Sequence, residues 1–171
     1  MSKYLHGLCA SGISGNMMIG ALLNYGVPFD YFKKSLTPLN LSGFSLIHEQ
    51  REKMGVEGTY FDVKLKGKGH GHAHVHTHDG IHFHTHAHGE RRNYPEIKAL
   101  IEAAPLSDWV KEKALTAFLN LGMAEAKVHN TTLDEVHFHE VGAIDCIIDI
   151  VGTMICLEYL DVTGIIFSPL H

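Results

Sequence analysis

Residues 137–152 read HFHEVGAIDCIIDIVG, and they join a pair of histidines to an apolar segment that carries two acids. Isoleucine and valine recur from Ile144 onward at the spacing of a buried helix, which we expect to cover about 143–159. Asp145 and Asp149 are four residues apart, so they would share one face of that helix. A carboxylate among apolar residues needs a partner, and a cation is the simplest one.

The residues just before this helix add nitrogen and oxygen donors. On an extended segment, His137 and His139 would face one side while Phe138 faces the core. Glu140 follows at a bend where Gly142 frees the backbone. Two imidazoles and up to three carboxylates suit a divalent transition metal. The alternative is a pair of core histidines beside a solvent-facing or salt-bridged acidic stripe, but the pattern favours a metal or reaction site.

Working outward, the hydrophobic pattern predicts a mixed α/β chain. Val63 and Leu65 alternate with Asp62 and two lysines, which indicates a sheet with one face in water. Asn16 is expected to cap the first helix. Strands are expected at about 4–9, 44–53, 59–66 and 163–167, with a brief extension at 136–138, and helices at 17–25, 28–36, 94–104, 107–129 and 143–159. The expected fold class is α/β (α+β-like), with one small mixed sheet covered by helices.

Nine of the fifteen histidines stand at alternate positions in one glycine-rich stretch, which predicts a flexible loop at 67–89. They are His70, His72, His74, His76, His78, His82, His84, His86 and His88. A solvated low-complexity insert would explain them, but alternate imidazoles on an extended backbone favour a metal-gathering arm. The loop does not identify its metal, and flexible ligands suit delivery or storage better than catalysis.

A second candidate site is the loop CASGISGN at residues 9–16, between a strand and a helix. Glycines let backbone amides approach a ligand, and a helix N-terminus favours a phosphate or carboxylate. The candidate contacts are Ser11, Gly12, Ser14 and Gly15. The loop lacks both the GK[ST] ending and the GxGxxG spacing, and a tight structural turn explains it equally well.

A third candidate is the pair Glu125 and His129, four residues apart near the end of the long helix. We interpret it as an ordinary pair on the helix surface.

Length and composition set outer limits on function. The chain has 171 residues, a net charge of −5 and 45% hydrophobic residues, which is typical of about one globular domain. The charge argues against a nucleic-acid partner, and the lack of a long apolar run argues against a membrane span. Three cysteines at uninformative spacings predict no disulfide framework, and with no secretion signal we expect a cytoplasmic location.

Three segments resemble the LarC-type nickel insertion proteins. They are SGISG at 11–15 followed by Met17, AEAKVH at 124–129, and above all HFHEVGAIDCIIDIVG. That family assembles the nickel-pincer cofactor of lactate racemase. The resemblance implies CTP-dependent cyclometallation of pyridinium-3,5-bisthiocarboxylic acid mononucleotide, in which nickel forms bonds to one ring carbon and two sulfurs.

By matching positions, the resemblance implies metal ligands at His137 and His139 besides the nine loop histidines. It implies catalytic metal or base roles for Glu140, Asp145 and Asp149. The glycine loop residues Ser11, Gly12, Ser14 and Gly15 would contact the mononucleotide phosphate.

The resemblance also carries expectations about the whole polypeptide. The family continues beyond residue 171 into a region where CTP binding is expected. Residues 1–171 would then be a single metal-binding domain that is a fragment, one of two separately made parts, or a degenerate copy. In the second case that region would be a separate partner chain, and lactate racemase would be the downstream acceptor. Four positions depart from the family pattern: Leu8 and Asn16 stand where Asp is usual, Met123 where an acid is usual, and Arg91 where His is usual.

Two other functions fit parts of the sequence. A nickel store or metallochaperone without catalytic activity would need only the histidine loop. A metal-assisted hydrolase could use the same core ligands to activate water, but no separate nucleophile is evident.

Overall fold

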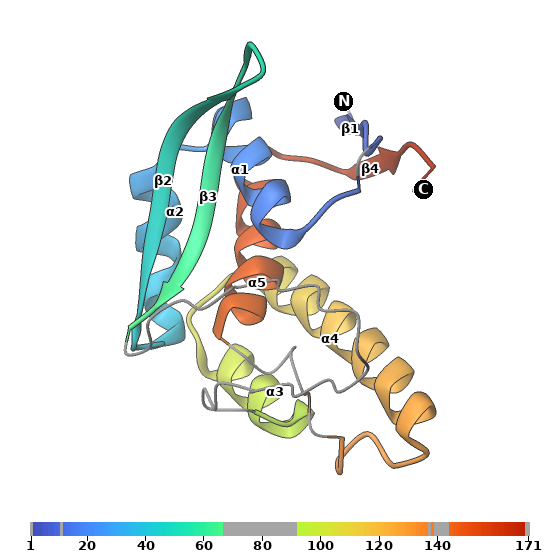
Figure 1. Cartoon of the computed structure of the whole chain (residues 1–171). Helices are drawn as coiled ribbons and strands as arrows, with labels where there is room; N and C mark the ends of the chain where they lie inside the picture. The colour runs from blue at the N-terminus through green and yellow to red at the C-terminus, as the bar shows by residue number, and fades with distance from the viewer. Residues whose placement is uncertain (1, 11, 67–91, 137, 139–143, 170–171) are drawn as a thin grey trace, which may run out of the picture.

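The computed structural model describes residues 2–10, 12–66, 92–136, 138 and 144–169 (Figure 1). The helices are α1 (Gly15–Tyr25), α2 (Phe29–Leu36), α3 (Tyr94–Ala103), α4 (Asp108–His129) and α5 (Ile144–Tyr159), with a 3-10 turn η1 at Thr37–Leu39. The strands are β1 (Tyr4–Gly7), β2 (Phe44–Lys53), β3 (Val56–Leu65) and β4 (Gly164–Phe167). The expected α/β class is confirmed. The histidine loop lies outside the described residues.

The strands form two separate sheets, so the expectation of one small mixed sheet is wrong. β1 pairs with β4 in parallel, and β2 pairs with β3 as an antiparallel hairpin. Helix α1 packs against both β3 and α5 and lies between the two strand pairs (Figure 1). Each pair therefore covers a different side of the helices, and their edges do not meet.

The hairpin turns earlier than its glycines suggested. Met54 and Gly55 both have positive φ, 54° and 79°, as a two-residue hairpin turn requires. β3 therefore begins at Val56, and Gly58 lies within the ladder opposite Arg51.

Helix α5 forms the centre of the core, as its apolar sequence predicted. Ile147, Ile148 and Val151 have no exposed surface. Gly152 lets α5 approach α2, because a Cβ there would lie 2.9 Å from the Phe32 ring. Gly20 does the same for α1 and β3, since its Cβ would lie 2.6 Å from the Thr59 carbonyl oxygen.

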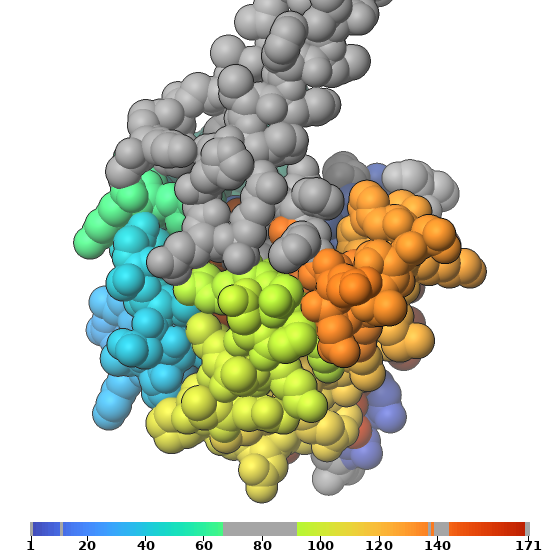
Figure 2. Space-filling view, turned by 90° about the horizontal axis from the view of Figure 1, so that it is seen from below, coloured from blue at the N-terminus to red at the C-terminus, as the bar shows by residue number. Residues whose placement is uncertain are grey.

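Helix α4 packs against α5, and α3 packs against α4. In the view from below, the yellow-green of α3 lies beside the yellow first part of α4 (Figure 2). Asn93 caps α3 in a capping box with Glu96, and Ser107 caps α4 as predicted, accepting a hydrogen bond from the Val110 N–H over 3.1 Å. None of the helices in the described part of the chain is long and apolar enough to cross a membrane.

Candidate functional site

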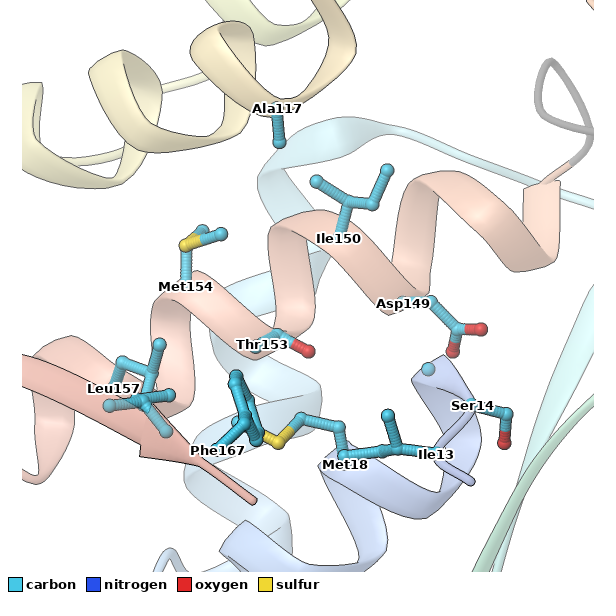
Figure 3. A pocket seen from close by; sticks show the side chains of 12 residues that line it. Ile13, Ser14, Met18, Ala117, Asp149, Ile150, Thr153, Met154, Leu157 and Phe167 are labelled. Atoms are coloured by element: carbon cyan, nitrogen blue, oxygen red, sulfur yellow. The ribbon is translucent and has the colours of Figure 1, made fainter. Parts of the chain in front are cut away.

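Asp149 is an acidic residue at the contact between α5 and the start of α1. It lies on the second turn of α5 and points toward the first turn of α1, beside Ser14 (Figure 3). A Cβ on Gly15 would overlap its carboxylate, so only glycine permits this approach. Its Oδ1 atom is buried and has no hydrogen-bond donor in the part of the chain that the structure describes. A buried oxygen of this kind calls for a proton, a donor or a cation.

The surroundings of Asp149 disfavour its charge. Burial, then the charges of Asp145 and Asp62, raise its pKa from the usual 3.8 to about 7. The carboxyl group is therefore close to half protonated at neutral pH. A group with this pKa can exchange protons in both directions near pH 7, and a nearby cation would favour its ionised form.

Asp145 stands one turn before Asp149, as the helical spacing predicted. Its Oδ1 accepts a hydrogen bond from the Cys146 N–H over 2.9 Å. Desolvation and the charges of both acids raise the pKa of the Cys146 thiol to about 12. Burial alone raises the pKa of Cys156 to about 12 as well. Both thiols therefore stay protonated at neutral pH.

Asp62 is a third acid near Asp149, besides Asp145, and it was not predicted from the sequence. The alternation along its strand assigned Asp62 to the face in water, but its side chain is half-buried. Its Oδ1 accepts a hydrogen bond from Asn16 Nδ2 over 2.9 Å, and its Oδ2 accepts one from the Tyr60 hydroxyl over 3.0 Å. Only the packing of α1 against β3 brings it near Asp149, and a single sequence carries no signal of that pairing.

The glycine loop forms a tight turn, and its cap differs from the expected one. Ser14 caps α1, its Oγ accepting a hydrogen bond from the Met17 N–H over 3.3 Å, so the prediction of Asn16 as the cap is wrong. The helix begins at Gly15, which places Asn16 in the first turn, where its amide reaches Asp62. Gly12 has a φ of 82° and donates its N–H to the Cys9 carbonyl.

The predicted anion contacts remain a prediction. Gly12, Ser14 and Gly15 surround the start of α1, and Ser11 lies outside the described residues. The group that approaches Gly15 is the Asp149 carboxylate. A ligand phosphate at this helix end would have to share the space with that acid.

The structure describes only part of the predicted metal site. His137, His139, Glu140 and the nine loop histidines lie outside the described residues. Among the residues that are described, no three His, Cys, Asp or Glu side chains are placed to hold one metal ion. Phe138 is buried, as predicted, and it lies against Gly122 of α4. The ligand set therefore stays a prediction.

Asp149 stands at one end of an apolar groove of about 390 Å³ (Figure 3). Met18 and Phe167 form one wall, and Thr153 and Met154 of α5 form the other. Such walls suit a flat, weakly polar group. The arrangement can hold such a group with one edge against a carboxyl whose pKa is close to neutral.

The pair of Glu125 and His129 is an ordinary surface pair, as interpreted from the sequence. Glu125 Oε2 lies 3.3 Å from His129 Nε2, and both side chains are partly exposed on α4.

Comparison with known proteins agrees with the resemblance found in the sequence. A family model described as nickel insertion protein matches residues 5–171. Three relatives are described as pyridinium-3,5-bisthiocarboxylic acid mononucleotide nickel insertion proteins. The one from Alkaliphilus metalliredigens is 42% identical over 171 residues, covering 100% of this chain and 40% of that protein. The one from Clostridium kluyveri is 44% identical over 170 residues (99% and 41%). The one from Lactiplantibacillus plantarum is 45% identical over 160 residues (94% and 38%).

The chain spans about two fifths of the length of these relatives. No solved structure matches it.

Proposed function

The chain belongs to the nickel insertion protein family, and on that premise we propose that it forms the metal-handling part of a nickel insertion enzyme. The reaction is the cyclometallation of pyridinium-3,5-bisthiocarboxylic acid mononucleotide, the compound in the relatives' names. Nickel is a substrate of this reaction. The observation that carries the proposal is the Asp149 carboxyl, which has a pKa of about 7 and a buried oxygen without a hydrogen-bond partner among the described residues.

The chemistry requires a base. As nickel(II) binds the two sulfurs, the ring carbon exchanges its bond to hydrogen for a bond to nickel. The electron pair of the broken C–H bond forms the C–Ni bond, and one proton leaves. No oxidant or reductant is needed. The proton must pass to a group that accepts it near neutral pH.

We propose that the Asp149 carboxylate accepts this proton. The carboxyl is ionised in a useful fraction at neutral pH, and bound nickel would increase that fraction. The apolar groove beside it would hold the pyridinium ring. Asp145 acts on Asp149 through its charge, and Glu140 is proposed as a further base or ligand from the sequence.

The remaining roles rest on the sequence and the family. His137 and His139 would hold the nickel ion, and the histidines at 70–88 would gather it. Ser14 and the loop glycines would contact the mononucleotide phosphate, beside Asp149 rather than in its place. We propose that CTP binds outside this chain, that the whole protein is a nickel-inserting lyase of the cytoplasm, and that lactate racemase receives the product.

Reconstitution tests this proposal. The chain is incubated with the bisthiocarboxylated mononucleotide, nickel, CTP and a polypeptide covering the rest of the Clostridium kluyveri relative, and product is followed by absorbance and mass. We expect product with the wild-type chain and a loss of about 100-fold or more for Asp149→Asn, the range typical of a missing base. Asp161→Asn, at an exposed acid in the turn after α5, is the control and should leave the rate unchanged.

Absence of product while the intact relative is active in parallel would contradict the proposal. So would an Asp149→Asn variant as fast as wild type.

A nickel store is the second candidate, favoured by the nine histidines between residues 70 and 88. It predicts several ions per chain and no effect of Asp149→Asn on nickel binding.

A further inference from the structure

The parallel pair β1–β4 has the features of an incomplete sheet. Each strand has four residues, and no third strand pairs with them in the described part of the chain. Parallel sheets are normally covered on both faces, and two strands alone are marginally stable. On the outer face, however, Tyr4 is 61% exposed and Ile166 is 60% exposed.

The register of the β1–β4 pair is nevertheless well defined. A Cβ on Gly164 would lie 2.8 Å from the Tyr4 ring, and a Cβ on Gly7 would lie 2.6 Å from the Phe167 ring. Each strand therefore provides a glycine on which an aromatic ring of the other strand rests, one pair on each face. Cross-strand pairs of this kind fix the register of a sheet, so β1 and β4 are a defined starting point for further strands.

The outer edge of β1 carries backbone groups that no strand in the described ranges pairs with. The carbonyls of Lys3 and Gly7 accept hydrogen bonds from the N–H groups of Thr163 and Ser168, so they point toward β4. Backbone groups alternate in direction along a strand. The N–H and C=O groups between them, those of Tyr4 and His6, therefore point to the opposite edge.

A largely apolar groove of about 510 Å³ lies between the β1–β4 pair and α1, and residues of β1, β4 and α1 line it. Its rim carries Leu8, which is 79% exposed, and Met17, which is 54% exposed. Tyr25 at the end of α1 extends the rim and is also exposed. An open strand edge beside a row of exposed apolar side chains is the arrangement that accepts an added strand.

We infer that an extended segment of the polypeptide that the longer relatives carry outside the matched region pairs with the open edge of β1 and fills the groove between β1 and α1. Its apolar side chains at alternate positions would cover Leu8 and Met17. That polypeptide amounts to about three fifths of each relative. This inference does not depend on the nickel chemistry.

The position of the chain after β4 supports this occupant. Ser168 follows β4 directly, and its Oγ accepts a hydrogen bond from the Cys9 N–H over 2.9 Å. In a longer relative, a segment that follows the counterpart of Ser168 would start beside the end of β1, and such tethering would give it a high effective concentration at the groove.

Hydrogen exchange on this chain and on the intact Clostridium kluyveri relative tests the inference. We expect the amides of Tyr4 and His6 to exchange at least 100-fold faster in this chain than their counterparts in the relative. Equal rates would overturn the inference. Protection in this chain that grows with protein concentration would also overturn it, because a second copy would then be the occupant.

A pair of substitutions gives an independent readout. Met17→Glu should leave the melting temperature of this chain unchanged, because the side chain is exposed, while the same change at the matching position of the relative lowers it. Val128→Glu, at a 77% exposed position of α4, is the control and should be neutral in both proteins. Equal effects of Met17→Glu in the two proteins, whether none or large, would overturn the inference.

Discussion

At the scale of single residues, Asp149 combines poor solvation with two acidic neighbours, Asp145 and Asp62. Asn16 reduces the repulsion at one of them, because its amide donates a hydrogen bond to Asp62. An aspartate at position 16, which the family resemblance leads one to expect, has no such donor when ionised and would add a further negative charge. The cluster of this chain is thus less acidic than the family pattern implies.

Replacing Asp149 by asparagine should stabilise the protein at alkaline pH. The raised pKa means that the folded state holds the Asp149 proton more tightly than the unfolded state does between about pH 4 and pH 7. Wild-type stability therefore falls as the pH rises through this range. We expect Asp149→Asn to raise the melting temperature by about 2–4 °C at pH 8, and the difference to vanish near pH 4.

Calorimetry at several pH values measures this difference, with Asp161→Asn as the control. A melting temperature for Asp149→Asn that is equal to or below that of wild type at pH 8 would show that the carboxylate is well solvated or paired.

At the scale of the elements, glycines set the contacts that position the site. Gly20 and Gly152 bring α1 against β3 and α5 against α2, and Gly15 admits the Asp149 carboxylate at the start of α1. These close approaches determine which side chains meet at the first turn of α1.

Adding one methyl group at Gly152 tests this packing. Gly152→Ala would press on the Phe32 ring and the Ile19 side chain, at 2.9 and 3.2 Å. We expect the free energy of unfolding in urea to fall by about 1–2 kcal/mol, the overpacking cost less the higher helix propensity of alanine. Gly58→Ala is the control, because no atom lies within 4 Å of its added Cβ. An equal effect of the two substitutions would argue against close packing at Gly152.

The sequence predicted the elements well and their contacts poorly. Periodicity and caps located α4 and α5 to within about a residue, because Ser107 and the run of buried isoleucines are local signals. The cap of α1 was assigned to Asn16 because both Ser14 and Asn16 are good capping residues. The predicted start of β3 was too late, because Gly55 and Gly58 are both suitable turn residues. The positive φ angles of Met54 and Gly55 show where the turn lies.

At the scale of the whole molecule, the division into two sheets could not be predicted. Strand pairing depends on contacts between distant segments, such as β1 and β4 at the two ends of the chain. For the same reason the position of Asp62 near Asp149 could not be predicted, because it depends on the packing of α1 on the hairpin. Asp145 and Asp149 could be predicted as a pair, because helical spacing alone places them one turn apart.

Nickel binding tests the central claim, that His137 and His139 hold one nickel ion within the fold, beside the Asp149 carboxylate. Calorimetric titration with nickel is carried out on the chain lacking residues 70–88, with Asp149→Asn and the control Asp161→Asn in the same background. We predict one tight site per chain, weakened at least tenfold by Asp149→Asn and unchanged by Asp161→Asn. Loss of all tight binding on removing residues 70–88, or equal affinity for both variants, would contradict the claim.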